Sequence, residues 1–528
     1  MIKQLKYHLV ALFVLQVALC FLYGYHKVYN KRPFSVHQWR QTDCASFTKN
    51  YYEEGMQFLQ PKIHWQGSIE GKTVSEFPLI NYTVACLWKV FGEHEALYRL
   101  TVLFIYILSL LFLFVMIYIT SHSLAYSYFA TSLISTSPVL AYYSFSFLAD
   151  VPALSFAIIS LSLFFMFIKT KKLSHFLPAV IVGTLATLLK ASAATVLLII
   201  GTVSMLTMFP VIPFFKAEEK LFKNKFVPLI TLALSAFSIY SWYHFAFLYN
   251  NQNSNGVFLM DILPLWNTPH KLETARALFN EQLPMCFNKG VLCALGIAIV
   301  WLLLNLNKLS FVLRMSLLIS LVSAMAFILL FFEVFNVHDY YLITTFILPV
   351  VVLVSFGNYL QKVSFTISGK KAILLCMSLF VCNAFYCASV MRLRIWDSGG
   401  KISAITPFIS NDEAKLTDWF HYQYEQTLKP LETITPYLRS LGLQRVDKVI
   451  SIPDPSFNIS LYLMDQKGFT ATEASLMADT NKLTGYKTLG AKYLILNDTN
   501  VLKLNSIKNL NKSKIGNYKN IFIYKLNP

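Results

Sequence analysis

Charged residues are scarce in this sequence, and acidic residues are scarcer than basic ones. Only 14% of the 528 residues are charged, with 27 Asp and Glu against 45 Lys and Arg, whereas 55% are hydrophobic. A soluble domain usually has roughly 25% charged residues. Long apolar runs recur from Leu9 to about Val390, and their length suits a bilayer core of roughly 30 Å. The composition therefore excludes an ordinary soluble protein and indicates a membrane region with one soluble piece.

Several common signatures are also missing. The eight cysteines form no CxxC pair, so the sequence has no zinc signature. No basic stripe with interleaved aromatic residues occurs, so the formal charge of +18 does not predict a nucleic-acid partner. We find no internal repeat and no low-complexity segment. The first apolar run continues to Tyr25 with no A-x-A site after it, which predicts an uncleaved first span.

Apolar length predicts about eleven transmembrane helices. They are expected near residues 9–25, 99–119, 124–147, 150–168, 174–190, 193–213, 227–248, 289–306, 315–335, 341–360 and 372–391. Basic residues cluster in alternate connections, at Lys169, Lys171, Lys172, Lys216, Lys220, Lys223, Lys225, Lys308, Arg314, Lys362, Lys370 and Lys371. Cytoplasmic connections are enriched in Lys and Arg. We therefore expect a multi-pass protein of the inner (plasma) membrane with a cytoplasmic N-terminus.

This topology places three polar segments on the extracytoplasmic side: a first loop at 26–98, a second at 249–288, and a C-terminal domain at 393–528 that follows a membrane region at 1–392. Two amphipathic helices are expected in the first loop, at 43–54 and from a Ser75 cap to Phe91, and both could lie along the membrane surface.

The C-terminal segment has the pattern of a small α/β domain. Strands are expected at 448–452, 492–496 and 520–524. Helical patterns lie near 430–442, 457–465 and 473–485.

Ionisable residues gather at the external ends of the spans, where they are costly and indicate function. Asp43 could act as a general base, but an acid near a helix start also complements the helix dipole. Asp150 precedes Val151-Pro152, where capping explains it equally well. Lys190 could bind phosphate or extend to the interface. Arg99 could be an interface anchor.

A short connection carries four further polar residues, His338, Asp339, Tyr340 and Tyr341. The two tyrosines could belong to the interfacial aromatic belt, but the adjacent His and Asp are unexplained in an otherwise apolar turn. Together with Glu76, all these residues lie at one membrane face. A carboxylate with basic groups suits chemistry on a substrate whose phosphate lies at the headgroup level, because the cations stabilise the developing charge.

The motifs Trp39-Arg40-Gln41-Thr42-Asp43, Glu76-Phe77-Pro78-Leu79, Arg99-Leu100, Asp150-Val151-Pro152 and His338-Asp339-Tyr340-Tyr341 resemble those of GT-C glycosyltransferases. The most similar group is the bacterial branch related to protein O-mannosyltransferases and the lipid A aminoarabinose transferase. The resemblance covers residues 1–390.

The resemblance implies inverting transfer of a sugar from a polyprenyl-phosphate donor to an acceptor hydroxyl. Asp43 then matches the general base and Asp150 a second acid. Lys190, Arg99 and Arg40 are expected near the donor phosphate, and Glu76, His338, Asp339, Tyr340 and Tyr341 are expected to line the cavity.

The sequence departs from this pattern in two places. Cys44 follows Asp43 where many members have a second acid, and Glu76 stands where many have a lysine. No cofactor and no metal are expected, although Glu76 and Asp43 together could hold a divalent cation. The expected partners are the polyprenyl-phosphate sugar, a lipid, glycan or protein acceptor, and membrane lipids.

Two other function classes are compatible with a polytopic membrane protein. A flippase or transporter of a lipid-linked saccharide would favour repeats and polar groups at the bilayer midplane, whereas here the charges lie at one end. A structural or assembly protein displaying its C-terminal domain would leave the one-sided polar cluster without a purpose.

Overall fold

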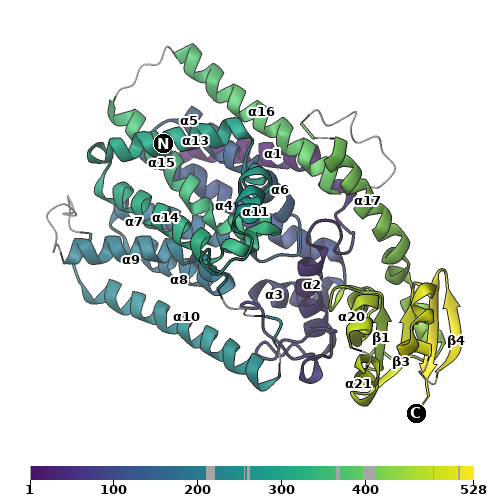
Figure 1. Ribbon diagram of the computed structural model, residues 1–528. Coiled ribbons are helices and arrows are strands. Elements are labelled where there is room, and N and C mark those ends of the chain that lie inside the picture. The colour runs from purple at the N-terminus through teal and green to yellow at the C-terminus, as the bar shows by residue number, and fades with distance from the viewer. Residues whose placement is uncertain are drawn as a thin grey trace.

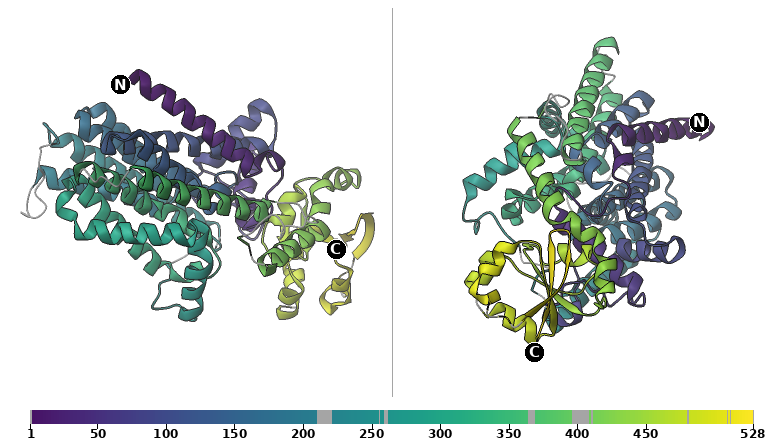
Figure 2. Two further views of the ribbon diagram at one scale, coloured as in Figure 1. Left: turned by 90° about the horizontal axis from the view of Figure 1, so that it is seen from above. Right: turned by 90° about the vertical axis from the view of Figure 1, so that its right-hand side faces the viewer.

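The computed structural model describes residues 2–209, 221–254, 256–258, 262–363, 369–395, 408–409, 411–479, 481–508, 510 and 512–527. An elongated bundle of helices makes up most of the molecule, and a small sheet-containing domain lies at one end of it (Figures 1 and 2). The N-terminus lies at the opposite end of the bundle (Figure 2, left).

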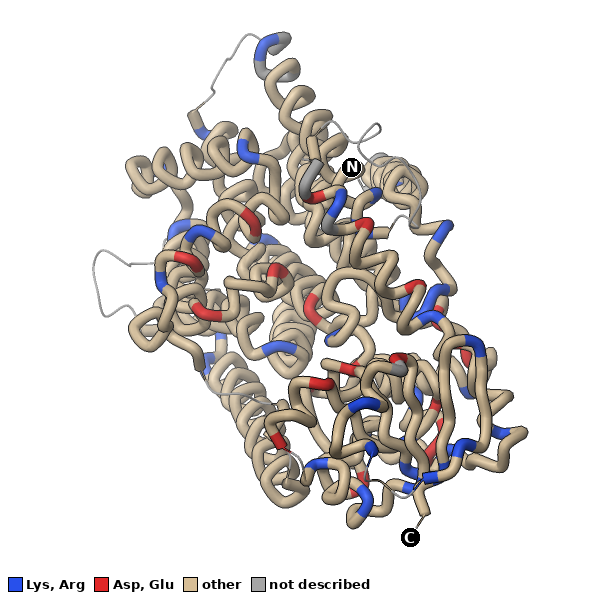
Figure 3. The backbone as a smooth tube through the Cα atoms, turned by 45° about the vertical axis from the view of Figure 1, so that its right-hand side comes forward, with Lys and Arg blue, Asp and Glu red and all other residues tan. Residues whose placement is uncertain are grey.

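Most of the bundle backbone carries neither acidic nor basic residues, as Figure 3 shows. α7 is central and largely buried between α4 and α8, whereas α1 and α10 expose most of their surface. The bundle helices are α1 (Ile2–Leu22), α4 (Glu95–Ser121), α5 (Leu124–Ser135), α6 (Pro138–Tyr143), α7 (Asp150–Thr170), α8 (Leu173–Leu189), α9 (Thr195–Met208), α10 (Phe226–Gln252), α13 (Lys289–Leu304), α14 (Phe311–Leu330), α15 (Ile347–Val363) and α16 (Gly369–Ile395).

Within the described residues, eight helices are long and apolar enough to cross a membrane, or nine if one bent pair counts as a single span. The chain is thus a multi-pass membrane protein, but three of the expected spans do not form single helices of membrane-spanning length. The span expected at 124–147 is broken into α5 and α6, because Ser137 caps α6 and Pro138 must begin a helix rather than continue one. α8 and α13 have only 17 and 16 residues. The span expected at 193–213 corresponds to α9. Residues 210–213 of that expected span lie outside the described residues.

The first loop contains two helices, α2 (Gln38–Glu53) and α3 (Leu79–Phe91), with short 3₁₀ turns η1 (Tyr25–Lys27) and η2 (Ile69–Gly71). Residues 41–51 of α2 are buried, so this helix is covered by other parts of the protein. α3 has an exposed apolar end, at Val90 and Phe91. The expected Ser75 cap is wrong: Pro78 precedes α3, and the Ser75 hydroxyl donates to Glu76 instead.

Short helical turns connect several of the bundle helices. The second loop contains α11 (Lys271–Ala277), the π-helical turn η5 (Leu278–Gln282) and α12 (Leu283–Cys286), after which the chain bends by 94° into α13. Further 3₁₀ segments between the bundle helices are η3 (Ala191–Ala194), η6 (Leu306–Lys308), η7 (Phe332–Asn336) and η8 (Asp339–Phe346).

The C-terminal domain has a five-stranded sheet in the order β2-β1-β3-β5-β4. β1 (Lys448–Ile452), β2 (Gly468–Thr470) and β3 (Ala491–Leu496) are parallel, while β5 (Ile521–Leu526) and β4 (Lys512–Tyr518) continue the sheet antiparallel. The three expected strands are confirmed as β1, β3 and β5, and β2 and β4 are additional. The domain's helical segments are α17 (Asn411–Thr427), η10 (Lys429–Thr433), α18 (Thr435–Ser440), α19 (Ile459–Leu463), α20 (Glu473–Ala478), α21 (Lys482–Thr488), η11 (Thr499–Lys503) and α22 (Asn505–Lys508).

Two features join this domain to the membrane region: a continuous helix and a packing contact. α16 runs past the expected boundary at residue 392 to Ile395, and α19 packs across α2. The buried position of α2 follows from this second contact, because one side of α2 faces the helix bundle and another faces the C-terminal domain.

Candidate active site

Arg40, in the first turn of α2, lies between two carboxylates. Its Nη2 donates to Ser75 Oγ at 2.6 Å and to the Glu76 carboxylate, and its Nη1 lies 3.8 Å from Asp43 Oδ2. Burial would raise the pKa of Glu76, but Arg40, Ser75 and Lys190 together lower that pKa below its ordinary value. Glu76 is therefore an anion paired with Arg40, and it does not repel a donor phosphate as an isolated acid would.

Asp43 lies in the second turn of α2, so capping of the helix start does not account for it. Its side chain is buried, and Oδ1 lies 3.5 Å from Asn458 Nδ2 of the C-terminal domain. Burial raises the pKa of Asp43 to about 8, because Arg40 and Asn458 offset the loss of hydration only in part. A carboxylate with such a pKa is a stronger base than an ordinary aspartate.

Lys190 forms an ion pair with Asp150, at 2.8 Å between Nζ and Oδ1. Asp150 is the first residue of α7, and Lys190 lies where α8 ends and η3 begins. The Lys190 ammonium also lies 4.8 Å from the ring centre of Tyr341 and 5.6 Å from that of Tyr340. The lysine thus points into the cluster and does not extend towards solvent.

The residues of the turn from His338 to Tyr341 make two separate sets of contacts. Asp339 accepts hydrogen bonds from Arg394 at 2.7 Å and Tyr143 at 2.6 Å, and its Oδ1 lies 3.3 Å from His37 Nε2. It therefore ties the start of α2 to α6 and α16. His338 stacks near Tyr340 and Tyr341, and within the described residues its buried Nδ1 has no hydrogen-bond partner. Burial lowers the pKa of His338 to about 4, so its imidazole is neutral.

Arg99 lies apart from this cluster. Its guanidinium donates to the backbone carbonyls of Phe145 at 2.6 Å and of Lys31 at 3.0 Å, and it stacks 4.5 Å from the ring centre of Phe147. These contacts join the first loop to the segment between α6 and α7. The geometry therefore makes Arg99 a structural clamp.

We expect Arg99→Met to lower the melting temperature without changing the apparent KM for a lipid-phosphate donor. Removing the guanidinium leaves buried carbonyls without donors, which costs about 1–3 kcal/mol for each unsatisfied group. Thermal unfolding in detergent and donor titration would measure the two effects separately. A donor KM that rises while the melting temperature is unchanged would contradict the structural role and indicate that Arg99 binds the phosphate.

A divalent cation between Asp43 and Glu76 does not fit these residues. Both carboxylates face the Arg40 guanidinium, which takes the position between them that a cation would need. Across the part of the chain that the structure describes, no three His, Cys, Asp or Glu side chains are grouped as metal ligands. We derive no step through a metal.

A pocket lined by hydroxyl groups lies beside Lys190, between η3, α14 and the end of η8. Two of its hydroxyls, Ser192 and Thr344, are hydrogen-bonded at 2.7 Å. Its lining residues are Ser192, Thr195, Ser320, Ser323, Ala324, Phe327, Thr344, Thr345, Ile347 and Leu348. Six hydroxyl groups line this small pocket, which has room for about one water molecule.

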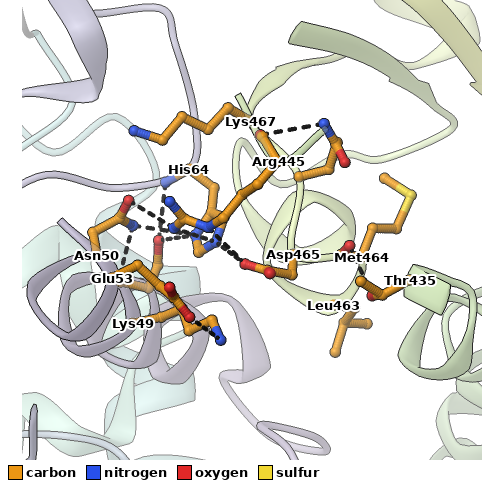
Figure 4. Close-up of polar contacts among 12 residues, drawn as sticks. Lys49, Asn50, Glu53, His64, Thr435, Arg445, Leu463, Met464, Asp465 and Lys467 are labelled. Atoms are coloured by element: carbon orange, nitrogen blue, oxygen red, sulfur yellow. Dashed lines mark hydrogen bonds and ion pairs between the residues drawn. The ribbon is translucent and has the colours of Figure 1, made fainter. Parts of the chain in front are cut away.

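A second polar network joins the first loop to the C-terminal domain (Figure 4). Arg445 donates to Asp465 at 2.9 Å, to Glu54 at 2.8 Å and to Asn50 at 3.1 Å. His64 Nε2 lies 3.5 Å from the same Asp465 carboxylate, and its backbone pairs with Gly468 at the edge of β2. This network fixes the domain against α2.

Part of this network has the residue types of a serine hydrolase triad. Ser46 Oγ lies 2.7 Å from His64 Nδ1, and His64 contacts Asp465. However, Ser46 and His64 are completely buried, and Ser46 Oγ also accepts the His64 backbone N–H at 3.0 Å. These residues and Arg445 join α2 to the C-terminal domain, so their contacts hold the domain in place.

Several residues at the site were not predicted from the sequence. His37 and Ser75 are adjacent to the predicted motifs and extend them. Asn458 comes from the C-terminal domain, as the last residue of the loop 453–458 that follows β1. The carboxyl ends of parallel strands are where ligands usually bind. That rule is the signal that could have identified Asn458.

Comparison with known proteins gives a consistent fold. No protein-family profile and no curated protein sequence matches the chain. The crystal structure of ArnT from Cupriavidus metallidurans in the apo state is 11% identical, with a TM-score of 0.59 over 98% of each chain, and that of ArnT bound to undecaprenyl phosphate has a TM-score of 0.57 over 98% of this chain and 97% of the other.

Two other solved structures share the architecture. The oligosaccharyltransferase of Archaeoglobus fulgidus in its apo form is 14% identical, with a TM-score of 0.50 over 93% of this chain and 69% of that one. The arabinofuranosyltransferase AftD from mycobacteria is 10% identical, with a TM-score of 0.50 over 98% of this chain and 40% of that one. The helix bundle, the buried polar end and these likenesses lead to one conclusion: the chain has the fold of the GT-C membrane glycosyltransferases.

Proposed function

We propose that this protein transfers a sugar from a polyprenyl-phosphate carrier to an acceptor hydroxyl, with inversion at the anomeric carbon. The observation that carries the proposal is the cluster of Asp43, Arg40, Glu76, Lys190 and Asp150 at one end of an apolar helix bundle. It combines a base with a raised pKa and two cations in a site adjoining the membrane. The likeness of the fold to ArnT bound to undecaprenyl phosphate supports the donor class.

The two cations form the donor side of the proposed site, where Lys190 and Arg40 would hold the phosphate. Within the described residues, the buried Arg40 Nη1 has no hydrogen-bond partner. A buried guanidinium N–H without a hydrogen bond is costly even with the Asp43 carboxylate nearby, and a phosphate oxygen would accept that bond.

Asp43 would serve the acceptor side. Its carboxylate takes the proton of the acceptor hydroxyl while the hydroxyl oxygen forms a bond to the anomeric carbon. The bond between that carbon and the phosphate oxygen breaks, and the polyprenyl phosphate leaves with the electron pair. Lys190 and Arg40 stabilise the charge that develops on the departing phosphate. With the lysine-rich connections in the cytoplasm, this reaction takes place on the extracytoplasmic face of the inner membrane.

Purified protein incubated with a panel of polyprenyl-phosphate sugars and an extract of envelope lipids and glycans should consume one donor and release polyprenyl phosphate. Mass spectrometry of the lipid fraction would measure both species, with protein-free samples as the blank. Movement of a lipid-linked saccharide across a vesicle membrane, with no loss of the donor, would contradict the proposal and favour a flippase.

A further inference from the structure

The C-terminal domain reaches the candidate active site through the loop 453–458, which follows β1. β1 is the central one of three parallel strands, and the loop at its carboxyl end reaches Asp43 in α2. In parallel sheets, loops at the carboxyl ends of the strands usually carry the functional residues. Here the last residue of the loop, Asn458, contacts Asp43 from a position 415 residues further along the chain.

This loop is held rigidly by its own hydrogen bonds. The buried Asp454 carboxylate accepts the Ser456 N–H at 2.8 Å, the Ser456 hydroxyl at 2.6 Å and the Ser460 N–H at 2.8 Å. Ser456 Oγ in turn accepts the Asn458 N–H at 3.2 Å. The backbone that carries Asn458 is therefore determined before any substrate binds.

Aromatic packing then fixes the loop against the membrane region. The Phe457 ring lies 6.0 Å from Trp39, 5.5 Å from Trp65 and 5.6 Å from Phe258, measured between ring centres. Phe258 also packs against the Arg40 guanidinium. The loop is thus anchored to the same residues that surround the cluster.

The Asn458 side chain is fully buried and incompletely bonded. Nδ2 lies 3.5 Å from Asp43 Oδ1, and Oδ1 has no hydrogen-bond partner among the described residues. Buried side-chain amides are normally satisfied on both atoms. An asparagine offers a donor to a carboxylate and an acceptor to a carboxylic acid, so it suits a neighbour that changes its protonation during a reaction.

We propose that Asn458 is a positioning residue that orients the Asp43 carboxyl group and stabilises its ionised form, so that the C-terminal domain completes the active site. The inference rests on the proposed function, in which Asp43 is the base. The charged groups facing Asp43 are Arg40 on the same helix and Glu76 from the first loop. Arg40 favours the carboxylate and Glu76 opposes it, and Asn458 adds a neutral donor from the other side.

The test measures the protonation of Asp43 directly in Asn458→Leu. The infrared carbonyl band that Asp43→Asn removes identifies the protonated carboxyl group, and its pH titration should have a midpoint near 8 in the unmodified protein. In Asn458→Leu the midpoint should rise by about one unit, because a donor to the carboxylate is lost. Turnover near pH 7 should then fall about tenfold and recover at higher pH, with the donor KM unchanged.

Asn497→Leu is the matched control, because Asn497 follows β3 at the same edge of the sheet and donates to Thr427, away from the site. It should leave the midpoint unchanged. Asn458→Asp keeps the side-chain size but loses the donor, and it should raise the midpoint at least as far as leucine does. Unchanged midpoints in both Asn458 variants overturn the positioning role. A raised midpoint in a protein that consumes no donor supports it and instead overturns the proposed transfer reaction.

Discussion

Replacing Asp43 with Asn should lower the turnover number by about 100- to 10,000-fold, which is the usual contribution of a general base. The amide keeps the shape of the side chain but takes no proton from the acceptor hydroxyl. The donor KM should change little, because Lys190 and Arg40 remain in place. Donor-consumption kinetics would measure both constants, and a melting curve would verify the fold. Turnover within a factor of two of the unmodified protein would remove Asp43 from the mechanism.

The same residue predicts the pH dependence of the reaction. The base is active when ionised, and burial raises the pKa of Asp43 to about 8. Turnover should therefore increase with pH through about 8 and then level off. The stability consequence has the opposite direction: the folded protein holds this proton more tightly than the unfolded chain, so the Asp43 contribution to stability decreases as pH rises from about 4 to about 8. Asp43→Asn should remove that dependence.

Replacing Lys190 with Met should destabilise the protein and weaken donor binding together. Asp150 would lose its 2.8 Å partner and become an unpaired buried acid. Breaking a buried ion pair in this way costs about 3–5 kcal/mol. The lost phosphate contact should raise the donor KM by about tenfold or more, since a hydrogen bond to a charged group contributes about 1.5–3 kcal/mol.

The double variant Lys190→Met with Asp150→Asn separates the two effects. Its melting temperature should return most of the way to that of the unmodified protein, because no charge is left unpaired. Its donor KM should stay high, because the cation is still absent. Recovery of both properties in the double variant would mean that the ion pair is structural only and that the donor phosphate binds elsewhere.

Much of the fold could be predicted from the sequence. The GT-C architecture is confirmed, as are strands at 448–452 and near 492–496. The expected spans near residues 124–147 and 289–306 are shorter than predicted, because hydropathy does not show where a helix breaks at Ser137-Pro138 or bends before α13. The burial of α2 was missed, because the surface that covers it comes from the C-terminal domain.

The site was predicted in part, and the roles of its residues stay predictions. Asp43, Arg40, Glu76, Lys190 and Asp150 do lie in one cluster, while the structure places Arg99 on backbone carbonyls. Residue type and span ends were enough to nominate these groups, because buried charge is rare in a membrane protein. Which of these groups form ion pairs with one another depends on the directions of their side chains, and hydropathy contains no information about those directions.

The sequence by itself determined that the chain is a membrane protein and that its polar residues gather at one end. Bilayer thickness acts on each segment separately, so apolar length can be read without knowing any neighbour. Only the tertiary structure decided how the polar end is assembled, because each pairing there joins separate segments: Lys190 with Asp150, Glu76 with Arg40, and Asn458 with Asp43. The low charge content that first marked the chain as a membrane protein also makes each of these buried pairs informative.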